Sequence, residues 1–147
     1  MFEKILVPLD GSIRAEKILG YVVDLAVLHN STVIVLQVLD PAADISTAGF
    51  FTPSREQLEK KKQEAEAYLD SVKARLQEKK IETRTLILTG IPLDCICQTA
   101  EKEKAGLIAM ASHGRTGASR LFYGSVSAGI LNQIDRPLLM IRSREGE

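Results

Sequence analysis

The chain has 147 residues, of which 45% are hydrophobic and 26% are charged. These values suit one domain, residues 1–147, with one hydrophobic core, and they exclude an intrinsically disordered chain. Lysine plus arginine and aspartate plus glutamate number 19 each, which argues against a broadly basic nucleic-acid-binding face and against a polybasic membrane anchor. We therefore expect no nucleic-acid partner and no membrane.

The first residues lead directly into a short apolar segment, without the hydrophobic region and cleavage site of a secretory signal. No apolar run approaches the roughly 18 residues of a membrane span, so we expect a cytoplasmic protein. Cys95 and Cys97 are two positions apart. That spacing points the two side chains to different faces of a helix and lacks the CxxC pattern, which favours small, partly buried side chains over a metal or redox pair.

The first third of the chain predicts a strand, a helix and a second strand. Residues 4–9 are nearly all apolar, as expected for a strand buried on both faces of a parallel sheet. A turn at Asp10-Gly11-Ser12 follows, and the apolar residues of 13–29 recur at helical spacing, with Ser12 as the expected N-cap. Residues 32–39 are rich in β-branched side chains and predict the second strand.

The middle of the chain predicts a long loop and a long helix. Residues 40–53 hold two prolines, a glycine and two phenylalanines, so we expect an irregular loop that covers a site or a partner surface. Residues 56–80 carry an apolar stripe among charged positions and predict an amphipathic helix on the outside of the sheet. Its lysines at 60–62 are balanced by nearby glutamates, which favours a solvated face over contact with nucleic acid.

The remaining elements continue the alternation. We expect a strand at 82–89, a helix from Pro92 to about 104, a strand at 106–111, a helix from Gly124-Ser125 to about 134, and a strand at 137–142. Strands that alternate with helices predict an open, doubly wound α/β fold: a Rossmann-like, five-stranded parallel sheet with helices on both faces.

Two loops mark the expected ligand site. In a doubly wound sheet, ligands bind beyond the carboxyl ends of the strands, at the point where the strand order reverses. The loops rich in small and polar residues follow the first strand, at 8–12, and the fourth strand, at 110–124. We therefore expect these two strands to be neighbours, the strand order to be 3-2-1-4-5, and the ligand to lie between Asp10 and residues 114–124.

The loop after the fourth strand has the composition of a phosphate site. It reads Ala111-Ser112-His113-Gly114, then nine residues, then Gly124-Ser125. Small residues let a ligand approach the main chain, and the free N–H groups that open the next helix favour an anion.

Other nucleotide-binding and phosphate-binding classes do not match. The first turn lacks GxGxxG, and GxxxxGK[ST] occurs nowhere, which argues against a dinucleotide dehydrogenase and a Walker-type NTPase. A phosphoacceptor receiver domain requires an aspartate at the end of the third strand, where this chain has Leu88-Thr89-Gly90.

Over nearly its whole length the chain resembles the universal stress protein family. The matching segments are residues 5–12, residues 110–117, Gly124-Ser125-Val126-Ser127 and the last strand from Pro137 to Arg142. The resemblance implies a five-stranded α/β fold and, in the nucleotide-binding branch of the family, an ATP pocket marked by G-2x-G-9x-G-[S/T]. It also implies pairing of the last strands, 137–142, in a homodimer.

The resemblance further implies the residues that bind ATP, AMP or ADP. Asp10 would hold the ribose or a metal ion, and Pro8, Ser12 and the backbone near Val38 would border the adenine and ribose. Mg²⁺ or Mn²⁺ would bind through the phosphates, with no protein-only metal site. The remaining nucleotide-binding positions lie in and after the fourth strand: Met110, Ala111, His113, Gly114, Arg115, Gly124, Ser125 and Val126.

Ala111 replaces the first glycine of this motif. If its methyl group points at the phosphates, overpacking of about 1–3 kcal/mol weakens binding, and if it points into the sheet the effect is near zero.

The favoured function is a regulatory protein that binds adenine nucleotides. The alternatives are a dimeric stress-response interaction module without nucleotide affinity and a slow ATP hydrolase. His113 has no nucleophile beside it in a catalytic pattern, so no catalytic residue is expected.

Overall fold

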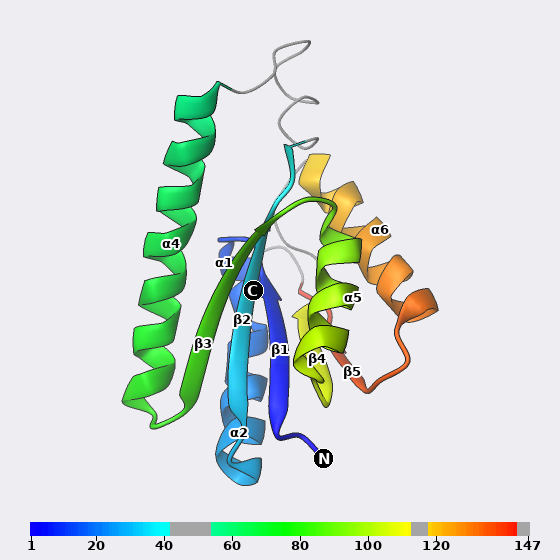
Figure 1. The fold of residues 1–147 in the computed structure, drawn as a ribbon. Coiled ribbons are helices and arrows are strands. Elements are labelled where there is room, and N and C mark those ends of the chain that lie inside the picture. Colours follow the sequence, from blue (N-terminus) through cyan, green and yellow to red (C-terminus); the bar gives the residue numbers. More distant parts are fainter. Residues whose placement is uncertain (42–53, 113–117, 144–147) are drawn as a thin grey trace.

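The computed structural model describes residues 1–41, 54–112 and 118–143, and of residues 118–125 it describes the backbone alone. Five parallel strands form one sheet in the order β3-β2-β1-β4-β5 (Figure 1). The predicted strand order and fold class are therefore confirmed. The strands are β1 (Lys4–Leu9), β2 (Thr32–Leu39), β3 (Glu82–Thr89), β4 (Leu107–Ala111) and β5 (Leu138–Ile141).

The three inner strands are buried on both faces because helices cover the sheet on each side. Every residue of β4 is buried, as are five of the six residues of β1. Alternate side chains of one strand enter separate hydrophobic clusters: Val33 and Val35 face one side of the sheet, and Ile34 and Leu36 face the other. This double burial explains the nearly continuous apolar runs in the sequence.

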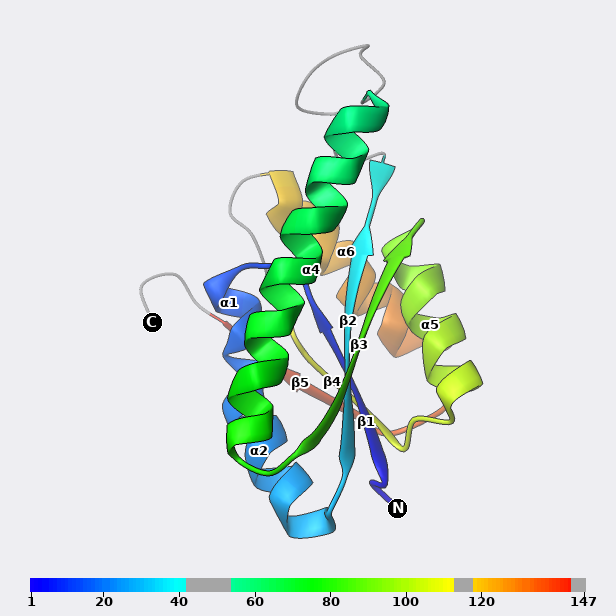
Figure 2. The same ribbon diagram turned by 60° about the vertical axis from the view of Figure 1, so that its left-hand side comes forward.

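Helices cover the two faces unequally. α1 (Ile13–Glu16), α2 (Ile18–His29) and α4 (Arg55–Glu78) lie on one face, and α5 (Pro92–Glu103) and α6 (Ala118–Gln133) lie on the other (Figures 1 and 2). The first turns of α4 continue past the carboxyl end of β3 (Figure 2). Leu58, in that part of the helix, is 41% exposed, whereas Leu69 and Leu76 are buried against the sheet.

The single helix predicted for residues 13–29 is interrupted. Lys17 separates α1 from α2, and its N–H donates to the carbonyl oxygen of Arg14, three residues back, at 3.3 Å. A bond of that span is tighter than the α-helical one and turns the chain between the two helices. The apolar spacing continues through the break, which is why periodicity alone predicted one helix.

The start of the last helix was predicted wrongly. α6 begins at Ala118, so Gly124 and Ser125 lie inside the helix rather than at its N-terminus. Residues 118–123 contain no proline or glycine, and one glycine inside a helix costs only about 1 kcal/mol, so the helix extends towards the amino end. Consequently, these two residues do not supply the free N–H groups of a first helical turn.

No described helix combines the length and apolar character that a membrane crossing requires. Of the expected loop at 40–53, residues 42–53 lie outside the described part of the chain.

Candidate functional site

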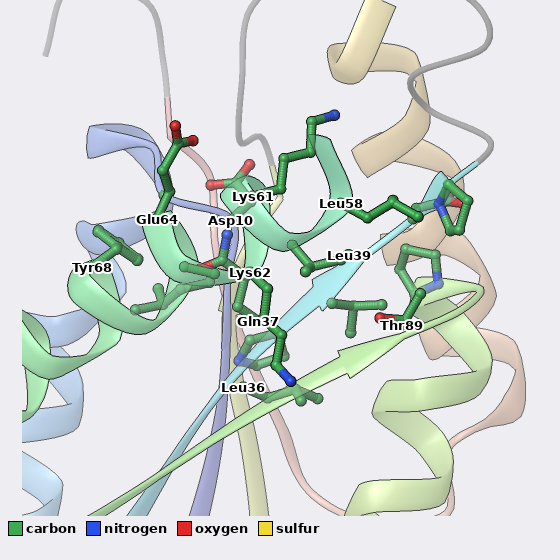
Figure 3. Close-up of a pocket in the computed structure, with 18 of the residues that line it drawn as sticks. Asp10, Leu36, Gln37, Leu39, Leu58, Lys61, Lys62, Glu64, Tyr68 and Thr89 are labelled. Atoms are coloured by element: carbon green, nitrogen blue, oxygen red, sulfur yellow. The ribbon is translucent and has the colours of Figure 1, made fainter. Parts of the chain in front are cut away.

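A cavity of about 540 Å³ lies at the carboxyl ends of β1, β2 and β3. Its floor comes from the ends of the strands, and α4 covers one side, with Pro92, Ile96 and Val126 from α5 and α6 on the other (Figure 3). The volume is within the range of small-molecule sites, which is about 300–1,000 Å³. The cavity lies at the carboxyl end of the sheet, where a ligand site was predicted, but its described lining comes from β1, β2 and β3 and not from β4.

The turn after β1 brings Asp10 to the cavity wall. The N–H of Ser12 donates to Oδ1 of Asp10 at 2.9 Å, and the N–H of Ala15 donates to Oγ of Ser12 at 3.1 Å. Gly11, between them, has φ +85°, a left-handed conformation that favours glycine. Thus Ser12 is the predicted N-cap of the first helix, and the turn fixes the carboxylate of Asp10 beside the cavity.

Four of the residues predicted from sequence line this cavity: Pro8, Asp10, Val38 and Val126. Ser12 caps α1 and is not part of the wall. The structure thus brings the loop after β1, the end of β2 and one position of α6 to the same cavity.

The predicted residues of β4 are buried in the sheet and do not line the cavity. Met110 and Ala111 are 0% and 1% exposed, and Met110 belongs to the cluster under α5 and α6. Because side chains alternate along a strand, Ala111 points to the opposite face, as Ala109 does. The methyl group of Ala111 is therefore accommodated inside the packed sheet.

The other predicted residues are described in part or not at all. His113, Gly114 and Arg115 lie outside the described residues. Gly124 and Ser125 belong to α6, and the structure describes only their backbone.

Helix α4 contributes a wall that the sequence did not predict. Lys61, Lys62, Glu64 and Tyr68 line the cavity together with Leu58 (Figure 3). In the sequence, these residues look like the solvated face of an amphipathic helix, because nothing there indicates that the helix continues past the sheet. Gln37 also lines the cavity. The sequence does distinguish Gln37, because it is the one amide side chain in the otherwise apolar run of residues 33–39.

One of these newly found groups, Oε1 of Gln37, is buried without a hydrogen-bond partner among the described residues. Burial, then the negative charge of Glu16 and the hydrogen bond of the Tyr68 hydroxyl with Glu16, and then the charge of Asp10 raise the pKa of Tyr68 above its ordinary value. The phenol therefore stays protonated and can both donate and accept a hydrogen bond at neutral pH.

A second set of unpartnered groups lies on the β4 and β5 side of the sheet. The buried hydroxyls of Ser112, Ser127 and Ser143 have no hydrogen-bond partner in the described parts of the chain. Ser112 follows β4 directly, and its N–H donates to the carbonyl oxygen of Ile141 in β5 at 2.8 Å. In the sequence, Ser112 and Ser127 flank the segment that the motif assigns to phosphate.

The described residues contain no group of three or more His, Cys, Asp or Glu side chains suited to a metal ion. Cys95 and Cys97 are free thiols in α5, and both are half-buried. Burial, reinforced by the charge of Asp94, raises the pKa of each thiol, which opposes formation of a reactive thiolate.

The five-stranded parallel sheet in the order β3-β2-β1-β4-β5, with helices on both faces, places the protein in the Rossmann-like class of α/β folds. Within that class, the sequence model of the universal stress protein family matches residues 1–142. The chain belongs to the universal stress protein family.

Relatives of known sequence and structure agree with this assignment. The chain is 30% identical to universal stress protein MJ0531 of Methanocaldococcus jannaschii, over 100% of this chain and 86% of that protein. The solved structure of MJ0577, a universal stress protein of the same organism, is 30% identical with a TM-score of 0.84, and the match covers 99% of both chains. A universal stress protein of Archaeoglobus fulgidus, solved in complex with dAMP, shares the fold at 22% identity, with a TM-score of 0.67 over 96% of this chain and 99% of that one.

Proposed function

We propose that this chain is a regulatory protein that binds an adenine nucleotide, ATP, ADP or AMP, in the cavity beyond β1 and β2. The observation that carries the proposal is the combination of an apolar cavity with the carboxylate of Asp10 at its wall. This cavity adjoins the switch point of the sheet, because β1 pairs with β2 on one side and with β4 on the other.

The walls of the cavity suit the two chemical halves of a nucleoside. Leu36, Val38, Ile96 and Val126 provide apolar surface for a flat base. Asp10 provides an acceptor for a sugar hydroxyl or a ligand for a metal ion that is itself bound to phosphate. The unpartnered hydroxyls of Ser112, Ser127 and Ser143, on the β4 and β5 side of the sheet, are available to phosphate oxygens.

The phosphates are assigned to the segment that follows β4. Gly114, Arg115, Gly124, Ser125 and Val126 surround them in this proposal, with Mg²⁺ or Mn²⁺ bridging the phosphate oxygens. Because Gly124 and Ser125 lie inside α6, this assignment rests on small residues that permit close approach, and no longer on a helix N-terminus. The burial of Ala111 in the sheet supports the assignment, since its methyl group adds no bulk to the cavity.

Nucleotide binding in a related fold supports the choice of ligand. The universal stress protein of Archaeoglobus fulgidus was solved with dAMP, which is an adenine nucleotide. In this chain the regulatory output is a change of partner when the nucleotide binds, and no catalytic step is required.

The edge strand β5 supports a second element of the proposal, a homodimer. β5 pairs with β4 along one side, and its residues Leu138, Leu139, Met140 and Ile141 are all half-buried. An edge strand has unpaired backbone groups that a second copy can satisfy. Sedimentation at micromolar concentration should give the mass of a dimer, and a monomer would count against this element.

The decisive experiment is a calorimetric titration with MgATP, together with mass spectrometry of any nucleotide released from the purified protein. We expect saturable binding that weakens at least tenfold in Asp10→Asn, a variant that keeps the acceptor for the N–H of Ser12 but removes the charge. Asp70→Asn, at an exposed position of α4, is the matched control. No bound nucleotide and no heat at millimolar MgATP would overturn the proposal and favour an interaction module without nucleotide affinity.

Hydrolysis is tested in the same samples. Release of ADP and phosphate that is lost in Asp10→Asn would instead make the protein a slow ATP hydrolase.

A further inference from the structure

The outer face of α2 is apolar although it is exposed. Apart from Asp24 and His29, every residue of this helix is apolar, a glycine or a tyrosine. The side of α2 that carries Ile18 and Val22 is buried against the sheet, yet Leu28 on the outer side is 77% exposed. A helix that is apolar all round is typical of one that is covered on every side. The outer face of α2 is therefore a candidate contact surface.

A line of residues on this face continues from α2 into α1. Its members are three or four positions apart, the spacing that places side chains on one face of a helix. Lys17, between the two helices, keeps right-handed helical angles, φ −60° and ψ −22°, so the spacing continues through the break. The two helices follow one another along the same face of the sheet (Figure 2). We call this line the outer stripe; it consists of Ile13, Lys17, Gly20, Tyr21, Asp24 and Leu28.

The outer stripe is complementary to its own reverse. Lys17 and Asp24 lie at equal distances from the midpoint between residues 20 and 21, and so do Ile13 and Leu28. A twofold axis at that midpoint places Lys17 opposite Asp24 of a second copy. The same axis places Ile13, which is 81% exposed, opposite Leu28. Each contact of a twofold interface occurs twice. In the described parts of the chain, neither Lys17 nor Asp24 has an ion-pair partner.

The centre of the stripe has room for a second helix. A Cβ at Gly20 would have no neighbour within 4 Å, so a partner helix can approach the main chain closely there. Gly20 also borders a hollow of about 530 Å³ between α2 and α4, whose apolar wall includes Leu19, Val23 and Leu76. Tyr21 of a second copy faces Gly20 in the twofold arrangement, and its ring can enter this hollow.

We propose that the outer stripe binds the outer stripe of a second copy of this chain, antiparallel, about a twofold axis between residues 20 and 21. Charge complementarity favours this occupant, because both charges of the stripe meet opposite charges and both apolar ends meet apolar ends. The contact is distinct from the proposed pairing of β5, since β5 lies at the edge of the sheet and the stripe faces away from the sheet. Chains that make both contacts form an assembly larger than a dimer.

The test is sedimentation equilibrium of the full chain without nucleotide, from micromolar to millimolar concentration. Lys17→Glu places two carboxylates opposite each other at each contact, and Asp24→Lys places two ammonium groups there. Each variant should weaken association through the stripe by at least about tenfold, because close like charges oppose binding. The unmodified protein should therefore reach about twice the mass of either variant at concentrations where the stripe is occupied.

An equal mixture of the two single variants gives the sharpest result. In a mixed pair, the two substituted residues face each other with opposite charges, and so do the unmodified Lys17 and Asp24. The mixture should therefore regain the mass of the unmodified protein, although neither variant does so alone. The double variant Lys17→Glu/Asp24→Lys should regain it as well.

Three further variants serve as controls. Lys102→Glu and Glu101→Lys make the same changes of net charge at exposed positions of α5, on the other face of the sheet, and should leave the mass unchanged. Gly20→Gln adds bulk at the axis, where a single copy has space for it, so it should weaken association without lowering the thermal unfolding midpoint. The unfolding midpoint of every variant reports on its fold.

The outcomes also separate this interface from the others proposed for the protein. If the unmodified protein never exceeds the mass of the two single charge variants, the proposal is overturned. A mixture of folded single variants that does not regain the mass would overturn it too, because the stripe would then meet a different surface. A dimer through β5 persists in all of these variants, and none of the measurements requires nucleotide binding.

Discussion

Arg84 and Glu103 form a two-point ion pair that ties β3 to the last residue of α5. Nη1 of Arg84 lies 2.9 Å from Oε2 of Glu103, and Nη2 lies 3.2 Å from Oε1. The side chain of Glu103 is 14% exposed and that of Arg84 is 46% exposed. The pair is therefore well aligned but open to solvent on the arginine side.

The pairing with Arg84 lowers the pKa of Glu103 in the folded protein. The stabilisation is therefore complete above the pKa of an unfolded glutamate, about 4.3, and is lost as the pH falls through the lower folded pKa. We expect Arg84→Gln to reduce the free energy of unfolding by less than about 1 kcal/mol at pH 7, because the pair is partly solvated. Chemical unfolding of the single variants and of Arg84→Gln/Glu103→Gln measures the coupling, which should vanish near pH 2 and shrink in 1 M salt. A coupling that persists at pH 2 would contradict the assignment.

Two glycines should respond oppositely to replacement by alanine. Gly20 is exposed within α2, and a Cβ there has no neighbour within 4 Å. Gly20→Ala should raise the free energy of unfolding by about 0.5–1 kcal/mol, because alanine loses less backbone entropy in a helix. At Gly106, a Cβ would collide with the main-chain carbonyl of Met1. Gly106→Ala should lower the free energy of unfolding by about 1–3 kcal/mol. Urea unfolding of both variants checks the prediction, and a stabilised Gly106→Ala would refute it.

Lys104 ends α5 in a left-handed conformation, with φ +54°. A residue with a Cβ is strained there, and glycine is not. We expect Lys104→Gly to stabilise the protein by about 0.5–1 kcal/mol, whereas Lys102→Gly, inside the same helix, should destabilise it by about 1 kcal/mol. Thermal unfolding midpoints of the two variants should move in opposite directions. A shift of the same sign in both would show that the backbone conformation at Lys104 is not the cause.

A capping box starts α4 at the side of the cavity. The N–H of Gln57 donates to Oγ of Ser54 at 3.2 Å, and the N–H of Ser54 donates to Oε1 of Gln57 at 2.9 Å. Ser54→Ala should cost about 1 kcal/mol and increase hydrogen exchange in the first turn of the helix. Ser71→Ala, at an exposed position in the interior of α4, should be neutral or slightly stabilising. Equal exchange in the first turn of both variants would contradict the role of the box.

Regular periodicity made most of the fold predictable. Strands buried on both faces and a 24-residue amphipathic helix leave strong patterns, so their positions agree with prediction within one or two residues. The strand order followed from where the two loops of small and polar residues fall. The break at Lys17 was missed because the helical spacing of apolar residues continues through it. The start of α6 at Ala118 was missed because Gly124 looks like a helix boundary in the sequence.

The candidate site was predictable only where it follows a strand. Pro8, Asp10 and Val38 lie at strand ends, whose meeting point the topology determines. Tyr68 and the lysines of α4 could not be found, because their role depends on how far one helix continues past the sheet. That distance depends on how the helix packs on the sheet, and no local sequence pattern indicates it.

The pairing of β1 with β4 has a consequence for how the protein forms. Ile5 pairs with Leu107, so the centre of the sheet joins residues from opposite ends of the chain. β1, β2 and β3 are all present once residue 89 has been synthesised. The strands that carry Asp10 and Gln37 are therefore made well before β4, and until β4 arrives the edge of β1 that pairs with it is open. Closing so long a loop is slow, so that edge stays open to aggregation until nearly the whole chain has been made.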